Sequence, residues 1–195
     1  MSREQGVRAA LIELTDTLAD TVEIVDLMRR LADHCVDLLG VDAAAALLAD
    51  SRGGLRMVVS SNERAELLNL SGLQSDEGPA LESFRRGEAI GAPDLATILN
   101  RWPRFAPEVL RQGYRSVQGI PLRLRDETIG ALALFADEAG SIREEHRTIA
   151  RALADAATIG ILHKRALRRS EVLLEQLQAT RMVVPATSRG LSGAG

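Results

Sequence analysis

The stretch Arg115–Phe135, RSVQGIPLRLRDETIGALALF, predicts two strands joined by a polar turn, Arg125–Thr128. In the first half, apolar and charged residues alternate, which is the period of a strand with one buried face. The second half, Ile129–Phe135, is apolar on both faces and is interrupted only by Gly130 and two alanines. A strand without a polar face is typical of the middle of a sheet that is covered on both sides. The rest of the chain must therefore supply one layer for each face of this hairpin.

Three further strands are predicted where turn signals flank short apolar runs. Val41–Ala49 has the composition of a helix, but it lies between Gly40, a helix-ending residue, and the turn Asp50–Gly54. This context favours a strand over the local propensity. Leu55–Ser60 completes that hairpin, and Ala89–Ala92 is a short strand that ends before a proline.

Helical patterns flank the predicted sheet at both ends of the chain. Residues 5–39 show apolar residues at spacings of three and four, and Asp20 or Thr21 can cap the second part of this segment. The last helix is expected to begin at Ser141, because Ser-Ile-Arg-Glu is a capping-box sequence. Its apolar stripe continues through Leu177, so we expect it to extend beyond its own domain.

The middle of the chain predicts an irregular arm. Short helices are expected over residues 62–70 and 80–86, with a turn-rich stretch, Ser71–Pro79, between them. Residues 95–114 contain two prolines and only short helical pieces. The fold class is therefore α+β, with layers in the order α/β/α: an antiparallel sheet has the terminal helices on one face and the arm on the other. A loose arm over a sheet face favours a pocket there.

Composition excludes several classes of function. A net charge of −3 does not by itself indicate a nucleic-acid or acidic-substrate partner. A single cysteine excludes a disulfide within the chain and any multi-cysteine metal site. No apolar run approaches the ~20 residues of a membrane span, and the charged N-terminus has no signal-peptide pattern. We therefore expect a cytoplasmic protein without a membrane partner.

Four stretches of the chain resemble the GAF domain, in the form found in actinobacterial GAF–ANTAR transcription antitermination regulators. They are Asp42–Ser60, Leu73–Ala80, Gly91–Leu95 and Val117–Phe135. The resemblance implies a sensor domain with a sheet of about six strands and a ligand pocket between the sheet and the arm. It also implies no catalytic residues and no metal or other fixed cofactor, although a small-molecule ligand is compatible with it.

In such regulators a long helix leads into an ANTAR module, a small helical domain that binds RNA hairpins and prevents transcription termination. Ser170–Gln178 resembles the start of that module, but the chain then departs from the pattern with Pro185 and glycine-rich sequence. We therefore expect a truncated or lost module. The implied organisation is an N-terminal helical segment (1–19), a GAF-like sensor domain (20–162), a helical linker or coiled coil (163–182) and a disordered tail (183–195).

Three of the five large aromatic residues lie in residues 95–114, and two interpretations of them stay open. They could wall a pocket for a small, partly apolar ligand, or they could close the core where the arm has few other apolar groups. A hairpin glutamine and a carboxylate at the start of the arm complete the set. The candidate ligand-binding residues are Trp102, Phe105, Tyr114, Gln118 and Asp94.

Other chemically interesting residues favour structural roles. Cys35 lies on the apolar stripe of a helix, which favours packing over reactivity. His146 and His163 are too far apart on one helix to share a metal. The loop carboxylates Asp76 and Glu77, like that of Asp94, favour turn-forming and capping roles.

The C-terminal helix carries two kinds of signal. Leu167, Leu174 and Leu177 favour pairing with a second copy, so a homodimer is predicted. The same segment is basic, which leaves RNA binding as an alternative. The basic residues are Lys164, Arg165, Arg168, Arg169 and Arg181.

We therefore expect a non-enzymatic regulatory sensor that signals through a dimerising C-terminal helix. One alternative is an RNA-binding antiterminator that retains activity in its basic helix, and RNA is a partner only in that case or through an ANTAR module. Another is a dimerisation domain without a ligand. An enzyme of the GAF-fold methionine sulfoxide reductase type is disfavoured, because that chemistry needs more than one cysteine and the chain has one.

Overall fold

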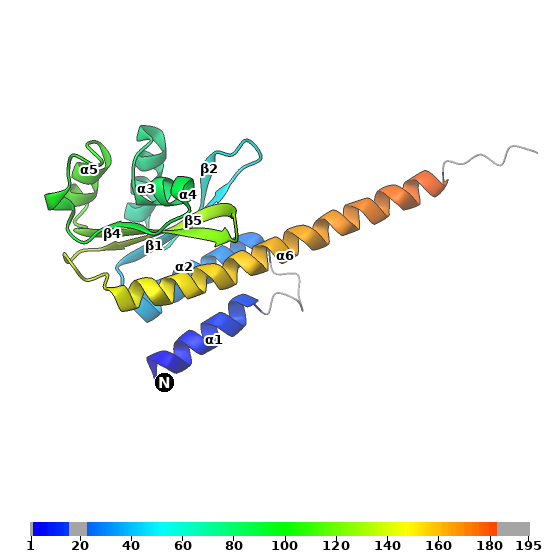
Figure 1. The fold of residues 1–195 in the computed structure, drawn as a ribbon, viewed down its shortest axis with the longest axis horizontal. Coiled ribbons are helices and arrows are strands. Elements are labelled where there is room, and N and C mark those ends of the chain that lie inside the picture. The colour runs from blue at the N-terminus through cyan, green and yellow to red at the C-terminus, as the bar shows by residue number, and fades with distance from the viewer. Residues whose placement is uncertain (1, 16–22, 183–195) are drawn as a thin grey trace, which may run out of the picture. The chain divides into compact units, whose positions relative to one another are not determined.

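The centre of the protein is an antiparallel sheet with the strand order β2-β1-β5-β4-β3 (Figure 1). The computed structural model describes residues 2–15 and 23–182. The strands are β1 (Ala43–Ala49), β2 (Leu55–Ser60), β3 (Ile90–Ala92), β4 (Ser116–Leu124) and β5 (Glu127–Ala136). The apolar strand β5 lies mid-sheet between β1 and β4, as its two apolar faces predict. Within the described residues the sheet has five strands, not the six that the family resemblance implied.

The β4–β5 hairpin is tighter than predicted. Leu124 pairs with Glu127, so the turn contains only Arg125 and Asp126. Arg125 has a φ of 54°, the left-handed conformation that such a short turn requires. Glu127 and Thr128 look like turn residues in the sequence, but they belong to β5 because their backbone groups pair with β4 at the exposed end of the hairpin.

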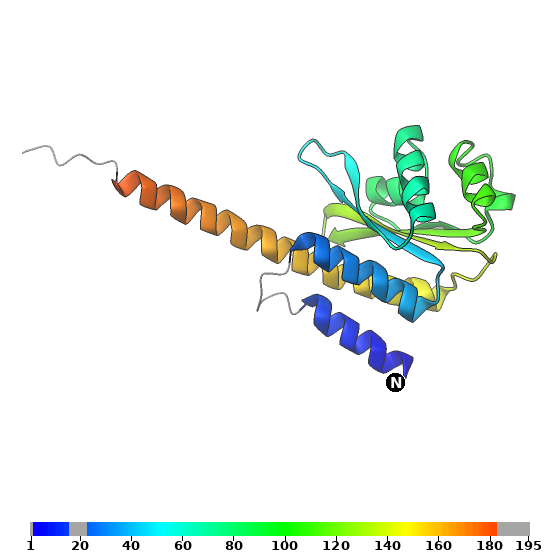
Figure 2. The same cartoon turned by 180° about the vertical axis from the view of Figure 1, so that it is seen from behind.

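Helices α1 (Arg3–Thr15) and α2 (Ile24–Leu39) lie on one side of the sheet, together with the part of α6 up to Ile161 (Figures 1 and 2). Helix α2 packs its apolar stripe on β1 and β2 and ends at Gly40, whose φ is 64°. Cys35 lies on that stripe, and burial raises the pKa of its thiol to about 12. The thiol is therefore protonated at neutral pH, which confirms the packing role predicted for it.

Helix α6 (Glu144–Met182) does not begin with the predicted capping box. The Ser141 hydroxyl donates to the carbonyl of Glu138 at 2.8 Å instead of accepting from the helix. The Nδ1 atom of His146 lies 3.0 Å from the carbonyl oxygen of Ser141, and the backbone N–H of Arg143 donates to that same oxygen at 3.1 Å. The carbonyl of Ser141, and not its hydroxyl, thus contacts the start of the helix, which begins three residues later than predicted.

The arm covers the opposite face of the sheet (Figure 1). Its elements are α3 (Glu63–Ser75), α4 (Pro79–Arg86), the 3-10 helix η1 (Leu95–Thr97) and α5 (Phe105–Arg111). Helix α3 runs through the first half of the stretch that the sequence predicts to be a turn. It ends only where Asp76 adopts a φ of 60° and donates its N–H to the carbonyl of Gly72.

Helix α4 begins in direct contact with the sheet at Gly119. A Cβ atom at this position would lie 2.1 Å from the carbonyl oxygen of Pro79, far inside van der Waals distance. Only a glycine on β4 lets the first turn of α4 approach the strand this closely. Helix α4 and strand β4 are therefore in backbone contact at this position, with no room for a side chain between them.

The chain divides into two compact units, residues 1–161 and 162–195. In the second unit the described residues, 162–182, form the continuation of α6. The tail predicted for residues 183–195 and the caps predicted at Asp20 or Thr21 lie outside the described residues. Among the helices of the described residues, none has both the length and the apolar content needed to cross a membrane.

The contact at Gly119 predicts a large effect of one methyl group. We expect Gly119→Ala to lower the free energy of unfolding by at least about 2 kcal/mol, because either α4 or β4 must move to admit the Cβ atom. Urea unfolding followed by circular dichroism measures this. Gly54→Ala is the matched control, since its Cβ would be 3.4 Å from the Asp50 carboxylate, which is ordinary van der Waals contact. Equal stability losses for the two variants would contradict the close approach.

Candidate functional site

The arm face of the sheet, where the sequence placed the ligand pocket, is filled by aromatic side chains. Trp102, Phe105 and Tyr114 are between 1% and 3% exposed and belong to one apolar cluster with the sheet. The rings of Trp102 and Phe105 meet edge to face at 6.1 Å, and Tyr114 packs on Phe135 at 5.4 Å. The three aromatics thus close the core, which is one of the two interpretations left open by the sequence.

The hollow that remains under the arm is too small for a ligand. It lies between α3, α4 and the ring of Phe105, and its volume is about 10 Å³. A single water molecule needs about 10–15 Å³ of such space. In this conformation a ligand can enter the described part of the arm face only if the arm moves.

Glu82, on α4, fastens the arm through its carboxylate. It accepts hydrogen bonds from Arg101 at 2.8 and 3.2 Å and from the indole N–H of Trp102 at 3.2 Å. The guanidinium of Arg101 also lies over the Trp102 ring, 5.0 Å from its centroid. The hydrogen bond from Arg101 holds the pKa of the Glu82 carboxyl below its ordinary value of 4.5. The indole therefore has a charged hydrogen-bond partner as well as its apolar contacts.

A second carboxylate, that of Glu77, caps the N-terminus of α5. It accepts the backbone N–H groups of Arg104 and Phe105, each at 2.9 Å. These N–H groups have no partner within a helix, so a carboxylate there satisfies both and complements the helix dipole. Glu77 and Glu82 lie in the α3–α4 part of the arm and hold its later part, residues 101–105; we call this pair the arm latch.

The remaining loop carboxylates have the roles that the sequence predicts. Asp94 accepts the backbone N–H of Ala96 and pairs with Arg115, and these two interactions lower the pKa of its carboxyl. Asp76 ends α3 and forms an ion pair with Arg85. Capping and turn formation therefore account for Asp94 in this conformation.

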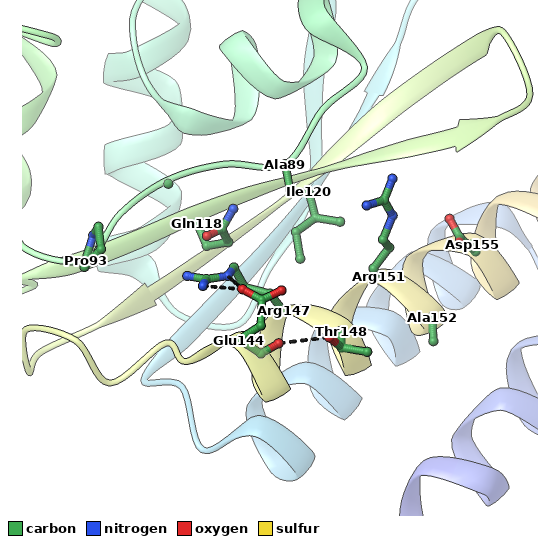
Figure 3. Close-up of a pocket in the computed structure, with 11 residues that line it drawn as sticks. Ala89, Pro93, Gln118, Ile120, Glu144, Arg147, Thr148, Arg151, Ala152 and Asp155 are labelled. Atoms are coloured by element: carbon green, nitrogen blue, oxygen red, sulfur yellow. Dashed lines mark hydrogen bonds and ion pairs between the residues drawn. The ribbon is translucent and has the colours of Figure 1, made fainter.

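Gln118 lies on the opposite face of the sheet from the three aromatics. It lines a cleft of about 650 Å³ between the β3–β4 edge of the sheet and the first turns of α6 (Figure 3). We call this hollow the edge cleft. Its lining residues are Ala89, Gly91, Pro93, Gln118, Ile120, Glu144, Arg147, Thr148, Arg151, Ala152 and Asp155. The structure thus separates Gln118 from the three aromatic candidate residues.

The edge cleft carries charged groups on its helical wall. Arg147 and Arg151 are one turn apart on α6, and both line the cleft (Figure 3). Arg147 forms an ion pair with Glu144. Asp155 lies near Arg151, and partial burial raises the pKa of its carboxyl despite that positive charge. The arginine spacing is readable in the sequence, but nothing there indicates that this face of α6 borders a cleft.

His146 lies beside another hollow, of about 810 Å³, between α1, the end of α2 and the start of α6. Its ring is 6% exposed, and burial lowers its pKa, so the ring is neutral at pH 7. Across residues 2–15 and 23–182, no three His, Cys, Asp or Glu side chains form a group that could hold a metal ion.

In the second unit, α6 exposes the leucines that the sequence assigns to dimerisation. Leu167, Leu174 and Leu177 are 47%, 59% and 64% exposed, and Val172 and Leu173 are exposed beside them. The basic residues of this segment differ in their surroundings, because Lys164 is 91% buried whereas Arg169 and Arg181 are exposed.

Comparison with known proteins places this fold in a recognised group. The family model of the GAF domain matches residues 21–162. The GAF domain of an Acinetobacter phosphoenolpyruvate-protein phosphotransferase superposes with a TM-score of 0.64 at 19% identity, covering 85% of this chain and 97% of that one. The GAF domain of the corresponding Coxiella burnetii protein gives 0.64 at 20% identity, covering 86% and 99%.

A third similar structure is the photoproduct state of GAF3 from Slr1393 of Synechocystis, with a TM-score of 0.62 at 13% identity, covering 75% of this chain and 98% of that one. A comparison with curated proteins found no matching sequence. At these identities the structural likeness concerns the fold alone.

The Glu82 carboxylate predicts a pH-dependent contribution to stability. Because its pKa is lowered in the folded state, its contribution is present above the ordinary pKa of 4.5 and is lost as the pH falls through the folded value. We expect Glu82→Gln to lower the free energy of unfolding by about 1–2 kcal/mol at pH 7. The difference from the wild-type protein should shrink below about pH 4.

Urea unfolding at a series of pH values measures this difference. Glu88→Gln is the control, because that side chain is exposed and we expect a change of no more than about 0.5 kcal/mol. If the stability difference between Glu82→Gln and the wild-type protein does not change with pH, the charge of the Glu82 carboxylate does not contribute to holding residues 101 and 102.

Proposed function

Because the chain belongs to the GAF domain family, a group of small-molecule-sensing and signalling modules, we propose that it is the sensory part of a transcription antitermination regulator. In this proposal it is a non-enzymatic, cytoplasmic homodimer whose C-terminal helix carries the signal. The antitermination role is supported by the resemblance of Ser170–Gln178 to the start of an ANTAR module. The sensing role is supported by the GAF fold itself.

The observation that carries the proposal is the exposed apolar surface of α6 beyond Ile161. Five large apolar residues in this single helix are exposed by 47% to 64%. Among residues 162–182 the structure contains no second element to cover them. An unpartnered helix with this much apolar surface is marginal in water, and a second copy of the same helix supplies the complementary surface.

Signalling then follows from a population shift at the arm. With the arm latch formed, the aromatics fill the space where a ligand would bind. A small, partly apolar ligand that displaces Trp102 or Phe105 needs the latch to release, so its binding favours an open arm. The helix pair responds if the open and closed arms favour different packings of α6 in the dimer.

The lack of enzymatic activity is part of the proposal. The single cysteine is buried on α2, and its thiol pKa is raised to about 12. A thiol in that state is a poor nucleophile at neutral pH. The carboxylates of the arm are engaged with backbone N–H groups and arginines, which suits a structural latch.

The proposal predicts a dimer at tens of micromolar protein that depends on the exposed leucines of α6. We expect Leu174→Asp/Leu177→Asp to dissociate it, because two charges on the pairing face cannot be buried without partners. Light scattering coupled to size exclusion measures the mass. Leu67→Asp, an equally exposed leucine on α3, is the control and should leave the dimer intact. If the wild-type protein is a monomer under these conditions, the proposed signalling mechanism is wrong.

The arm latch predicts a second effect, on the local opening of the arm. In Glu77→Ala the N–H groups of Arg104 and Phe105 lose their acceptor. We expect their hydrogen exchange to accelerate at least about tenfold, while the amides of β5 keep their protection. Exchange followed by mass spectrometry or NMR resolves the two regions. Unchanged exchange at the start of α5, or an equal acceleration in β5, would exclude a separately opening arm.

A further inference from the structure

The edge cleft exists because the edge strand β3 and the residue before it present only small side chains toward the helical layer. Ala89 and Gly91 line it from the β3 side, and Ile90 between them points into the core under the arm. Helix α2 packs on β1 and β2, at the other end of the sheet. A hollow of about 650 Å³ therefore remains between β4, the strand next to the edge, and α6.

The floor of the edge cleft combines an apolar surface with one fixed amide. Gln118 is 4% exposed, and its Nε2 donates to the carbonyl of Gly119 at 3.0 Å. Its Oε1 occupies the space above Gly91, where a Cβ atom would lie only 2.3 Å away. Ile120, 1% exposed, continues the floor beside it (Figure 3). Because Gly91 has no Cβ atom, the amide of Gln118 has room to lie across the strand at the bottom of the cleft.

The helical wall carries two guanidinium groups beside this floor. Arg147 and Arg151 are four residues apart on α6, and their guanidinium groups point in different directions (Figure 3). Within the described residues the Arg151 guanidinium donates no hydrogen bond, and its charged neighbour is Asp155. Arginine presents five N–H donors in a fork that suits carboxylate and phosphate oxygens. An anion in the cleft would satisfy donors of Arg151.

We propose that the edge cleft binds a small molecule that carries a carboxylate or phosphate group. The anionic group binds a guanidinium of the helical wall, that of Arg147 or of Arg151, and the uncharged part of the molecule lies on Ile120 and the amide of Gln118. This site is on the opposite face of the sheet from the arm, so it goes beyond the sensing role proposed above and does not depend on it.

The cleft also contains two carboxylates, which compete with a bound anion for the arginines. Glu144 pairs with Arg147, but its own side chain is 80% exposed, so a ligand anion can replace it at little cost. Asp155 stays beside Arg151 and balances part of its charge. The net charge of the empty cleft is therefore close to zero, and binding relies on directed hydrogen bonds from a guanidinium more than on a broad positive field.

The test is calorimetric titration of the full chain with two probes, inorganic phosphate and malonate, against sodium chloride at equal ionic strength. We expect at least one probe to bind, and its identity distinguishes a phosphate site from a carboxylate site. Arg147→Gln/Arg151→Gln should weaken that binding at least about tenfold, the loss expected from one charge-assisted hydrogen bond. Ala89→Phe, which fills the cleft from an exposed position without changing charge, should weaken it as well.

Arg56→Gln is the matched control, because Arg56 lies on β2 with its side chain 75% exposed and its charge paired with Asp50. It should leave the affinity unchanged. If neither probe binds more tightly than chloride, or if Arg56→Gln weakens binding as much as the double variant, there is no anion site in the edge cleft. Dimerisation of the chain is unaffected by either result, so the two proposals fail separately.

Discussion

The structure depends on β5, a strand whose two faces are both buried. Strand β5 is buried along almost its whole length, and it pairs with β1 on one side and β4 on the other. Its alternate residues reach the helical layer and the arm, so neither layer can be removed without exposing apolar surface. The position of every other element follows from covering one face or the other of this strand.

The two faces are covered in different ways. On the arm side, packing is tight enough that Gly119 touches the backbone of Pro79, and the carboxylates of Glu77 and Glu82 hold the two parts of the arm together. On the helical side, α2 lies over β1 and β2, and the far edge of the sheet borders a cleft beside α6. A ligand thus reaches the arm face only if the arm moves, whereas the helical face already has an open cleft at the β3–β4 edge.

Two helix boundaries depart from the patterns in the sequence. The capping box at Ser141 does not form, because the Ser141 hydroxyl donates to the carbonyl of Glu138. Helix α3 continues to Ser75 through residues with turn propensity, and it ends where Asp76 adopts a left-handed conformation. In each case one residue at the helix end sets the boundary through a hydrogen bond that the pattern of residue types does not predict.

The sequence by itself determined the α+β class, the central place of β5, the long last helix and the capping roles of the loop carboxylates, because each depends on periodicity or on residues close in the chain. It left open whether Trp102, Phe105 and Tyr114 line a pocket or fill a core. Only the tertiary structure decided how they pack here, together with the placement of Gln118 on the other face and the meeting of Arg147 and Arg151 with the edge of the sheet. Those outcomes depend on how closely layers approach, and that distance is set by contacts such as Gly119 against Pro79 between residues far apart in the chain.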